Sequence, residues 1–344
     1  MVTGDGTVLY SSDAEAADDP AVYQGGCRGD FSTASQCSAG WRHLDAGATS
    51  DADHAYYLEL RDRSGFDFDG HGQIDRSPLG FSAGLDFETK IFVKEKAPQL
   101  LREFLSKPRW QPEPITMSGV TDCYQPAERH FQLTRQCLEV ALAARQPVTI
   151  VTKNALILRD LDILSEMATM NLVMVALSIT SLDQSLTRLL EPRTSAPSAR
   201  LRAVSELSAA GVPVIVLMAP LIPGLTDDEM APILQAAAEH GAASANYTML
   251  RLPLSVRPIF LDWLEQHAPA KKQRIEGLLR WIRDGQLNDA QFGVRMRGTG
   301  IMADQIGRLF DMLKKKNQLD RTTPRLDTSR FTPPAEPNGQ MRLF

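Results

Sequence analysis

The sequence predicts an α/β protein whose parallel sheet curls into a full or partial barrel. Short, β-branched apolar runs at residues 173–177 and 213–219 are typical of strands buried on both faces. Segments with apolar residues at helical spacing follow these runs. Successive strand–helix units of this kind, joined by right-handed crossovers, form a parallel sheet.

The first units run from residue 89 to residue 170. Strands are predicted at residues 89–94, 115–118 and 148–152, and helices at residues 97–105, 129–144 and 159–170. One face of the second helix is apolar and includes Cys137. We interpret Cys137 as a small buried hydrophobic residue.

The unit at residues 173–193 places hydroxyl groups at the end of a strand. Ser178, Thr180 and Ser181 follow the apolar run, and leucines at helical spacing come next. Thr180 or Ser181 is therefore expected to cap a short helix. An ordinary capped helix without a binding role is the alternative interpretation.

The remaining units complete the sheet and lead into a helical region. A helix is predicted at residues 197–210, with Gly211 ending it. Thr226 and Glu229 predict a capping box that opens the next helix, which Gly241 ends. The last strand is expected at residues 245–250, and C-terminal helices are expected at residues 259–267, 271–283 and 301–316.

Composition limits the class of protein. The chain has 344 residues, of which 43% are hydrophobic and 23% charged, enough for one large domain or two ordinary ones. A net charge of −5 argues against a generally nucleic-acid-binding surface. The start lacks the features of a signal peptide, and no apolar run approaches a membrane span, so we expect a cytoplasmic protein. Four widely spaced cysteines imply no disulfide framework.

Amino-acid composition and the pattern of apolar residues divide the chain into four parts. Residues 1–78 are rich in Asp, Gly and Ser and are expected to be poorly ordered; Asp67, Asp69 and His71 fit no calcium loop. Residues 79–251 form the expected barrel, and residues 252–319 the helical C-terminal region. Residues 320–344 are polar and Pro-rich and predict a flexible tail.

Small and polar residues gather at the predicted carboxyl ends of the strands, where ligands bind in parallel α/β folds. They are Ser118, Gly119, Thr121, Asp122, Thr152, Lys153, Asn154, Ser178, Thr180 and residues 220–225. A catalytic histidine and a pair of carboxylates are missing there, so this rim suits an extended polar cofactor better than hydrolysis by side chains. Arg193 could pair with a carboxylate of a ligand, or with Glu191 or Glu206.

Seven segments resemble, in the same order from about residue 79 onward, the radical S-adenosylmethionine (radical SAM) family: LDFETKIFVK, MSGVTDCYQPAER, LTRQCLEV, TIVTKN, SITSLDQSLTRLLEPR, AGVPVIVLMAPLIPGLTDDE and NDAQFGVRMRGTG. The branch that they resemble contains the proteins related to spore photoproduct lyase. The resemblance implies a partial parallel (β/α)6 TIM-like barrel with a helical C-terminal extension. It also implies lyase-like enzymes that cleave S-adenosylmethionine (SAM) reductively to a 5′-deoxyadenosyl radical, with DNA repair as one analogy.

The resemblance places the SAM site at the ends of three strands. The segment after the second strand holds the methionine amino group, the fourth strand contacts the ribose and carboxylate, and the loop after the fifth strand backs the adenine. The corresponding residues are, in that order, Ser118, Gly119 and Thr121; Ser178, Thr180 and Arg193; and Ile222, Pro223 and Gly224. Lys153, at the end of the third strand, is included in the expected cofactor site.

The chain departs from the family at the iron–sulfur loop. Relatives hold a [4Fe-4S] cluster with C-x3-C-x2-C shortly before the LDFETKI segment. Residues 62–78, which correspond to that loop, contain no cysteine, and the pairs Cys27/Cys37 and Cys123/Cys137 match neither spacing. We therefore expect the cluster to be absent or defective here, with no metal ligands and with unknown catalytic residues.

Two explanations remain open at this point. The first explanation is that a frameshift or a misplaced start has replaced the family's N-terminal region. The change in composition near residue 78 favours it. Alternatively, a true relative has lost the cluster and keeps the barrel as a non-catalytic SAM-binding or adaptor protein. The substrate is not readable from the sequence.

The last five residues resemble a clamp-binding pentapeptide. Gln340, Met341, Leu343 and Phe344 match its pattern, and the apolar side chains could fill a groove on a bacterial sliding clamp. The alternative interpretation is that these residues are a chain terminus without a binding role.

Overall fold

The computed structural model describes residues 93–118, 121–252, 256–288, 294–321, 323 and 325–334, with the backbone of residues 41–44 and 55–58. Five parallel strands pair in chain order: β3 (Ile115–Met117), β4 (Val148–Thr152), β5 (Val173–Ser178), β6 (Val214–Leu221) and β7 (Ser244–Met249). Beyond β3, the sheet continues with β2 (Ala55–Leu58), parallel to β3, and β1 (Trp41–Leu44), antiparallel to β2. The strand predicted at residues 89–94 lies outside the described residues except for its last two, which belong to no strand.

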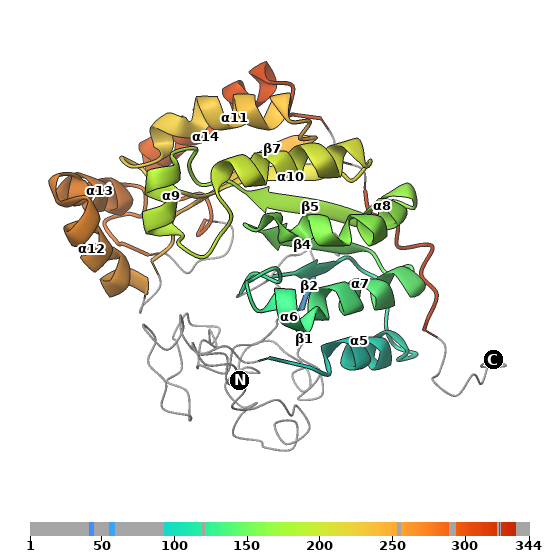
Figure 1. Ribbon diagram of the computed structural model, residues 1–344. Coiled ribbons are helices and arrows are strands. Elements are labelled where there is room, and N and C mark those ends of the chain that lie inside the picture. The colour runs from blue at the N-terminus through green and yellow to red at the C-terminus, as the bar shows by residue number, and fades with distance from the viewer. Residues whose placement is uncertain are drawn as a thin grey trace, which may run out of the picture.

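Helices connect the parallel strands and lie along one face of the sheet (Figure 1). They are α5 (Ala97–Leu105), α6 (Glu128–Phe131), α7 (Leu133–Ala143), η2 (Ala155–Asp160), α8 (Leu161–Thr169), α9 (Gln184–Leu190), α10 (Pro197–Ala209), η3 (Asp227–Glu229) and α11 (Met230–Glu239). Three more helices follow β7: α12 (Val256–His267), α13 (Pro269–Trp281) and α14 (Gly300–Lys316). The predicted α/β class, with a parallel sheet consistent with a partial TIM-like barrel, is confirmed.

The two faces of the sheet differ in burial. Ile150, Val175 and Val214 are neighbours in register on the face that packs against the helices, and all three are buried. Buried and half-buried residues alternate along β4 and β6, and the half-buried ones, such as Val151 and Ile215, lie on the opposite face. The prediction of burial on both faces therefore holds closely for β5 and is wrong for β6, because the helices that the structure describes cover one face of the sheet.

Two predicted helix caps are wrong because the polar side chains bind elsewhere, and one predicted helix is divided into two. Asp183, rather than Thr180 or Ser181, caps α9 by accepting the backbone N–H groups of residues 185 and 186. Thr226 forms no capping box, since its Oγ1 accepts the Ile222 N–H at 2.9 Å. The helix predicted at residues 129–144 is broken at Gln132, whose φ of 51° is left-handed, into α6 and α7.

The end of the described chain runs back along the sheet. The sequence predicted a flexible tail from Asp320, whereas the backbone N–H of Asp327 donates to the Asn171 carbonyl and that of Thr332 donates to the Ala144 carbonyl, each at 2.9 Å. Both carbonyls lie in turns that precede strands. Residues 327–332 are thus held across the amino ends of β4 and β5, where they pass α8 and α7 (Figure 1).

Helices α12, α13 and α14 lie in the part of the chain where the sequence predicted a helical C-terminal region, and they contact the sheet or its covering helices at two places. Helix α12 lies at the end of the sheet that carries α9 (Figure 1), and the Trp263 Nε1–H donates to the Leu189 carbonyl at 3.0 Å. Helix α14 packs against α11 and β7, where Tyr247 and Phe310 bring their ring centroids to 4.7 Å. Within the described residues, no helix combines the length and the apolar character that crossing a membrane requires.

Candidate functional site

The loop after β3 is fastened to the end of β4 by one carboxylate. Asp122 accepts the Thr152 hydroxyl at 2.7 Å through Oδ1 and the Lys153 N–H at 2.7 Å through Oδ2. Ser118, with a left-handed φ of 78°, accepts the Cys123 N–H at 2.9 Å through Oγ. These bonds fix the positions of the Ser118 and Lys153 backbones relative to each other. Gly119 lies outside the described residues, and Thr121 is half-buried.

A buried ionic network joins the ends of β4 and β5 to the first turn of α10. Glu191 pairs with Lys153 Nζ at 3.1 Å and with the Arg200 guanidinium at 2.8 Å. Arg200 also donates to the carbonyls of Ser178, at 2.9 Å, and Ser195, at 2.7 Å, while Thr180 donates to the Glu191 carboxylate at 2.7 Å. The Arg200 side chain is almost completely buried, whereas that of Lys153 is 29% exposed.

Opposing effects set the charge state of Glu191. Burial raises the pKa of its carboxyl group, but the charges of Lys153 and Arg200 and the hydrogen bonds from Arg200 and Thr180 bring the pKa below its ordinary value. Glu191 is therefore ionised at neutral pH. Its lowered folded-state pKa contributes stability above the ordinary glutamate pKa, and that contribution is lost as the pH falls through the lowered value.

Neither Arg200 nor a site role for Glu191 was predicted from the sequence. Arg200 shares one buried face of α10 with Val204 and Leu207, at a spacing of four and three residues. A cation on an apolar helical stripe is the signal that could have pointed to a buried partner. Arg193, the expected carboxylate partner, is exposed, while Glu191 pairs with Arg200 and Glu206 with Arg202.

Two further cross-links hold the rim. Glu229 accepts the Ser181 hydroxyl at 2.5 Å and the Leu182 N–H at 2.6 Å, which joins the loop after β6 to the loop after β5. The Asn154 Oδ1 accepts the Leu156 N–H and the Ser195 hydroxyl, each at 3.0 Å. The carboxyl ends of β4, β5 and β6 are thus fixed to one another by side-chain hydrogen bonds.

The loop after β6 is packed rather than open. Ile222 and Pro223 are buried. Gly224 has a φ of 81°, and its N–H donates to Asp227 Oδ1 at 2.8 Å. A Cβ at position 224 would stand 3.0 Å from a Leu278 methyl group of α13. Ile222, Pro223 and Gly224 were expected to back an adenine. Of these three residues, only the half-buried Gly224 is accessible to a ligand to a larger extent, through its backbone.

Replacement of Gly224 by alanine separates the steric and backbone effects at this loop. Gly211 is the matched control, because its φ of 78° is equally left-handed but a Cβ there would meet no atom within 4 Å. We expect Gly211→Ala to lower the free energy of unfolding by about 1 kcal/mol. Gly224→Ala should cost about 1–3 kcal/mol more because it adds overpacking against Leu278. Urea denaturation measures both, and equal losses would contradict the packing of this loop against α13.

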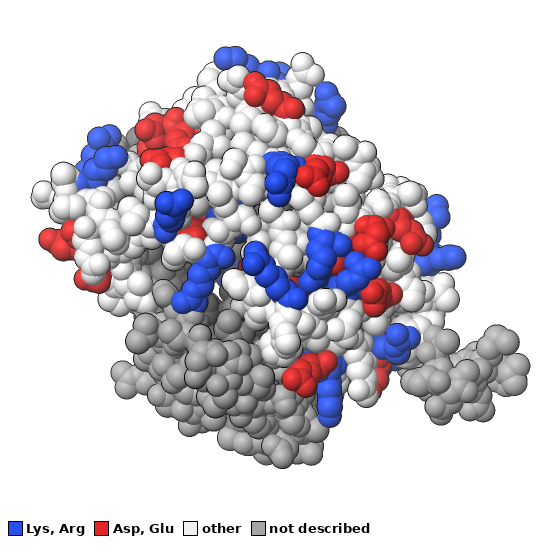
Figure 2. All heavy atoms as spheres, viewed as in Figure 1, with Lys and Arg blue, Asp and Glu red and all other residues white. Residues whose placement is uncertain are grey.

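A second ionic cluster is centred on Asp160 of η2 and joins η2 to α7 and α8. The buried Asp160 carboxylate accepts the Tyr124 hydroxyl at 3.0 Å and pairs with Arg159 at 2.7 Å and Arg135 at 3.2 Å. Arg135 also pairs with Asp162, which lowers the pKa of Asp162 to about 2. Figure 2 shows basic and acidic side chains interspersed on this face. The cluster holds the chain between β3 and α7 against η2.

The described cysteines do not suit an iron–sulfur cluster. Cluster ligands are thiolates. Cys123 and Cys137 are buried, and Cys137 lies in the core as predicted. Burial raises the pKa of both thiols, with Asp122 adding to the effect at Cys123 and Glu128 at Cys137. The described residues also contain no group of three His, Cys, Asp or Glu side chains placed to hold a metal ion. Cys27 and Cys37 lie outside them.

The fixed strand ends of this parallel sheet carry hydroxyl groups, a lysine and Gly224, and the carboxyl ends of the strands are where parallel α/β domains bind ligands. Residues 88–237 match the Radical SAM superfamily. The chain therefore carries a radical SAM domain, and the resemblance read from the sequence is confirmed at the level of the superfamily.

Several proteins share this region. The uncharacterized protein Rv2578c of Mycobacterium tuberculosis is 34% identical over 204 residues, which are 59% of this chain and 60% of that protein. The uncharacterized protein MJ0683 of Methanocaldococcus jannaschii is 32% identical over 139 residues, 40% of this chain and 50% of that protein. A spore photoproduct lyase structure with bound AdoMet and dinucleoside spore photoproduct overlaps 52% of each chain at 16% identity and a TM-score of 0.40. The chain thus matches half to three fifths of the length of these proteins.

Proposed function

We propose that the radical SAM domain of this chain binds SAM at the carboxyl ends of β3–β6 and that the chain does not assemble a [4Fe-4S] cluster. The superfamily match supports the first part, since SAM is the shared ligand of that superfamily. The buried thiols of Cys123 and Cys137 and the absence of a C-x3-C-x2-C loop from the sequence support the second part.

The charge balance of the ionic network carries the proposal for SAM. Lys153 and Arg200 supply two positive charges, and Glu191 supplies one negative charge. Within this network of three residues one positive charge is therefore left over, on the partly exposed Lys153. The Asp122 carboxylate nearby is bonded to the Thr152 hydroxyl and to the Lys153 backbone N–H, and no ion pair joins it to the Lys153 side chain within the described residues. A ligand carboxylate, such as that of the methionine part of SAM, would balance this positive charge through a charge-assisted hydrogen bond.

Ser178 adds a second contact point beside this lysine. Its side chain lies on the sheet face opposite the helices, because its register partner is Leu217, a half-buried residue of that face. Within the described residues, the Ser178 hydroxyl makes no hydrogen bond, although its carbonyl accepts from Arg200. Thr180, by contrast, uses its hydroxyl on Glu191 and the Ala219 carbonyl. We therefore assign Ser178 to ligand contact and Thr180 to positioning Glu191.

Calorimetric titration of SAM into the full chain tests the proposal. We expect saturable one-site binding, and we expect adenosine, which lacks the carboxylate, to bind at least about tenfold more weakly because it cannot use Lys153. No saturable heat up to about 1 mM SAM, where binding would be worth only about 4 kcal/mol, would contradict SAM binding. Equal affinity for adenosine would contradict the role of Lys153.

Without a cluster, the chain lacks the source of the electron that cleaves SAM in relatives, so the proposed activity is binding. Membership of the branch related to spore photoproduct lyase stays a prediction. So does the sliding-clamp contact, since Gln340, Met341, Leu343 and Phe344 lie outside the described residues.

A further inference from the structure

An open pocket lies at the edge of the sheet, between the edge strand β7 and α14. Its volume is about 430 Å³, within the range of about 300–1,000 Å³ that is usual for small-ligand pockets. It is lined by Tyr247, Arg297, Gly298, Ala303, Asp304, Gly307, Arg308 and Asp311. Arg297 and Gly298 belong to the NDAQFGVRMRGTG segment, which the proposed SAM site does not use.

Small residues on α14 keep this space open. Gly307 stands in the middle of a 17-residue helix, where glycine is unfavourable relative to alanine. A Cβ at position 307 would come within 3.2 Å of the Tyr247 hydroxyl. Within the described residues, that hydroxyl makes no hydrogen bond. The helix thus leaves room beside a phenol that is free to bind a ligand.

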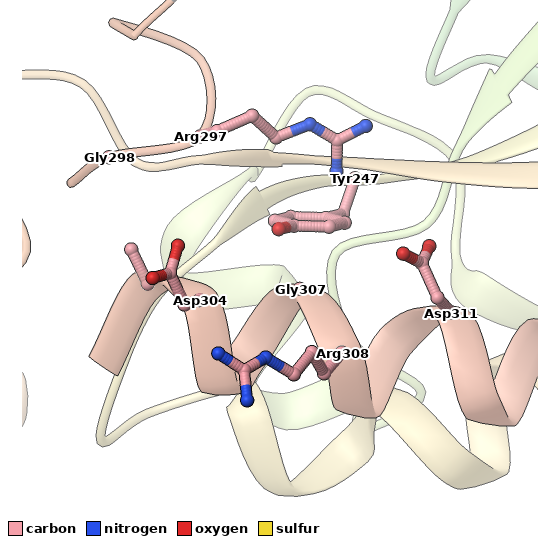
Figure 3. Close-up of a pocket in the computed structure, with 8 residues that line it drawn as sticks. Tyr247, Arg297, Gly298, Asp304, Gly307, Arg308 and Asp311 are labelled. Atoms are coloured by element: carbon pink, nitrogen blue, oxygen red, sulfur yellow. The ribbon is translucent and has the colours of Figure 1, made fainter. Parts of the chain in front are cut away.

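The loop before α14 supplies the other wall. The Arg297 guanidinium lies over the Tyr247 ring (Figure 3), 4.0 Å from its centroid. It also donates a hydrogen bond to Asn246 Oδ1. These two contacts hold the guanidinium in place before any ligand arrives. Arg297 forms no ion pair within the described part of the chain.

The charged side chains that line the pocket indicate which class of ligand it can bind. Two arginines and two aspartates balance, and none of the four is ion-paired within the described residues. A plain anion would be opposed by Asp304 and Asp311, and a plain cation by Arg297 and Arg308, so a ligand with both charges fits best. In Figure 3, Arg297 from the loop and Asp311 from the helix lie toward one end of the pocket, and Asp304 and the Tyr247 hydroxyl toward the other.

We propose that this cavity binds a zwitterionic α-amino acid, with its carboxylate on Arg297 and its ammonium group on Asp311. The Tyr247 hydroxyl and Asp304 then face the ligand side chain. None of the residues that line this pocket is among those proposed to contact SAM, so the two proposals are tested separately.

Ligand-observed NMR on the full chain tests this with each of the twenty free L-amino acids as probe. We expect at least one to bind saturably below about 10 mM, and its N-acetyl and methyl-ester derivatives, each missing one charge, to bind at least about tenfold more weakly. The double variant Arg297→Gln/Asp311→Asn should abolish the binding. The matched control Arg274→Gln/Asp262→Asn, which makes the same charge changes on α13 and α12, should leave it unchanged.

Three results would overturn the proposal. They are saturation by none of the twenty amino acids below about 10 mM, equal binding of the N-acetyl derivative, which would indicate a site for anions only, and persistence of binding in the double variant. A parallel SAM titration keeps the two sites distinguishable, because loss of amino-acid binding in the double variant should leave SAM affinity unchanged.

Discussion

Replacement of Arg200 by methionine is expected to lower the free energy of unfolding by about 3–5 kcal/mol, because it leaves the buried Glu191 carboxylate without its main partner. Methionine fills much of the arginine volume, so lost packing contributes little to the difference. The change also removes the donors that bind the Ser178 and Ser195 carbonyls. Urea denaturation followed by circular dichroism measures the effect.

Arg202 offers the matched control two residues away on the same helix. Its side chain is 66% exposed, and it pairs with Glu206 at 3.3 Å. Arg202→Met should change the free energy of unfolding by less than about 1 kcal/mol, as exposed ion pairs do. A loss of similar size in the two variants would show that Arg200 does not organise the ends of the strands.

Replacement of Lys153 by methionine is expected to weaken SAM binding by about 10- to 100-fold, which corresponds to losing one hydrogen bond to a charged group. The fold should survive, since Glu191 keeps its bonds to Arg200 and Thr180 and the Lys153 side chain is partly exposed. Calorimetry gives the affinities. Lys272→Met is the control, because Lys272 pairs with Glu265 across α12 and α13 and takes no part in the network of Glu191 and Arg200.

Unchanged SAM affinity in Lys153→Met would contradict the charge-balance argument while leaving SAM binding itself in place. A large loss of affinity in Lys272→Met would indicate a general electrostatic effect instead of a contact. The two variants each remove one lysine charge, so their difference isolates the position of the charge.

Local pattern accounts for the parts of the fold that the sequence predicted well. Residues 148–152 and 97–105 were predicted with the bounds that β4 and α5 have, since their apolar spacing and flanking residues are local signals. The glycines that end α10 and α11 have left-handed φ values, as expected for Gly211 and Gly241.

Contacts between distant segments account for what the sequence did not show. Thr226 and Glu229 have the spacing of a capping box, but Glu229 binds Ser181, which lies 48 residues earlier. Likewise, Glu191 becomes part of the site only because α10 brings Arg200 beneath β5. These polar side chains form hydrogen bonds and ion pairs with residues that are distant in the sequence, and a short-range sequence pattern does not indicate such partners.

The pocket beside β7 was also beyond sequence reasoning. Tyr247 and Arg297 are fifty residues apart and meet only because the loop before α14 returns to the edge of the sheet. The resemblance included the segment that carries Arg297, but nothing in its pattern indicated a cavity on the helix side.

We propose that this chain keeps the SAM-binding sheet of a radical SAM domain without the thiolates that a cluster needs. Anaerobic reconstitution of the full chain with iron and sulfide, followed by assay of both per chain, tests it most directly. The account predicts iron and sulfide well below the content of one [4Fe-4S] cluster per chain. A stoichiometric four-iron, four-sulfide content would contradict it.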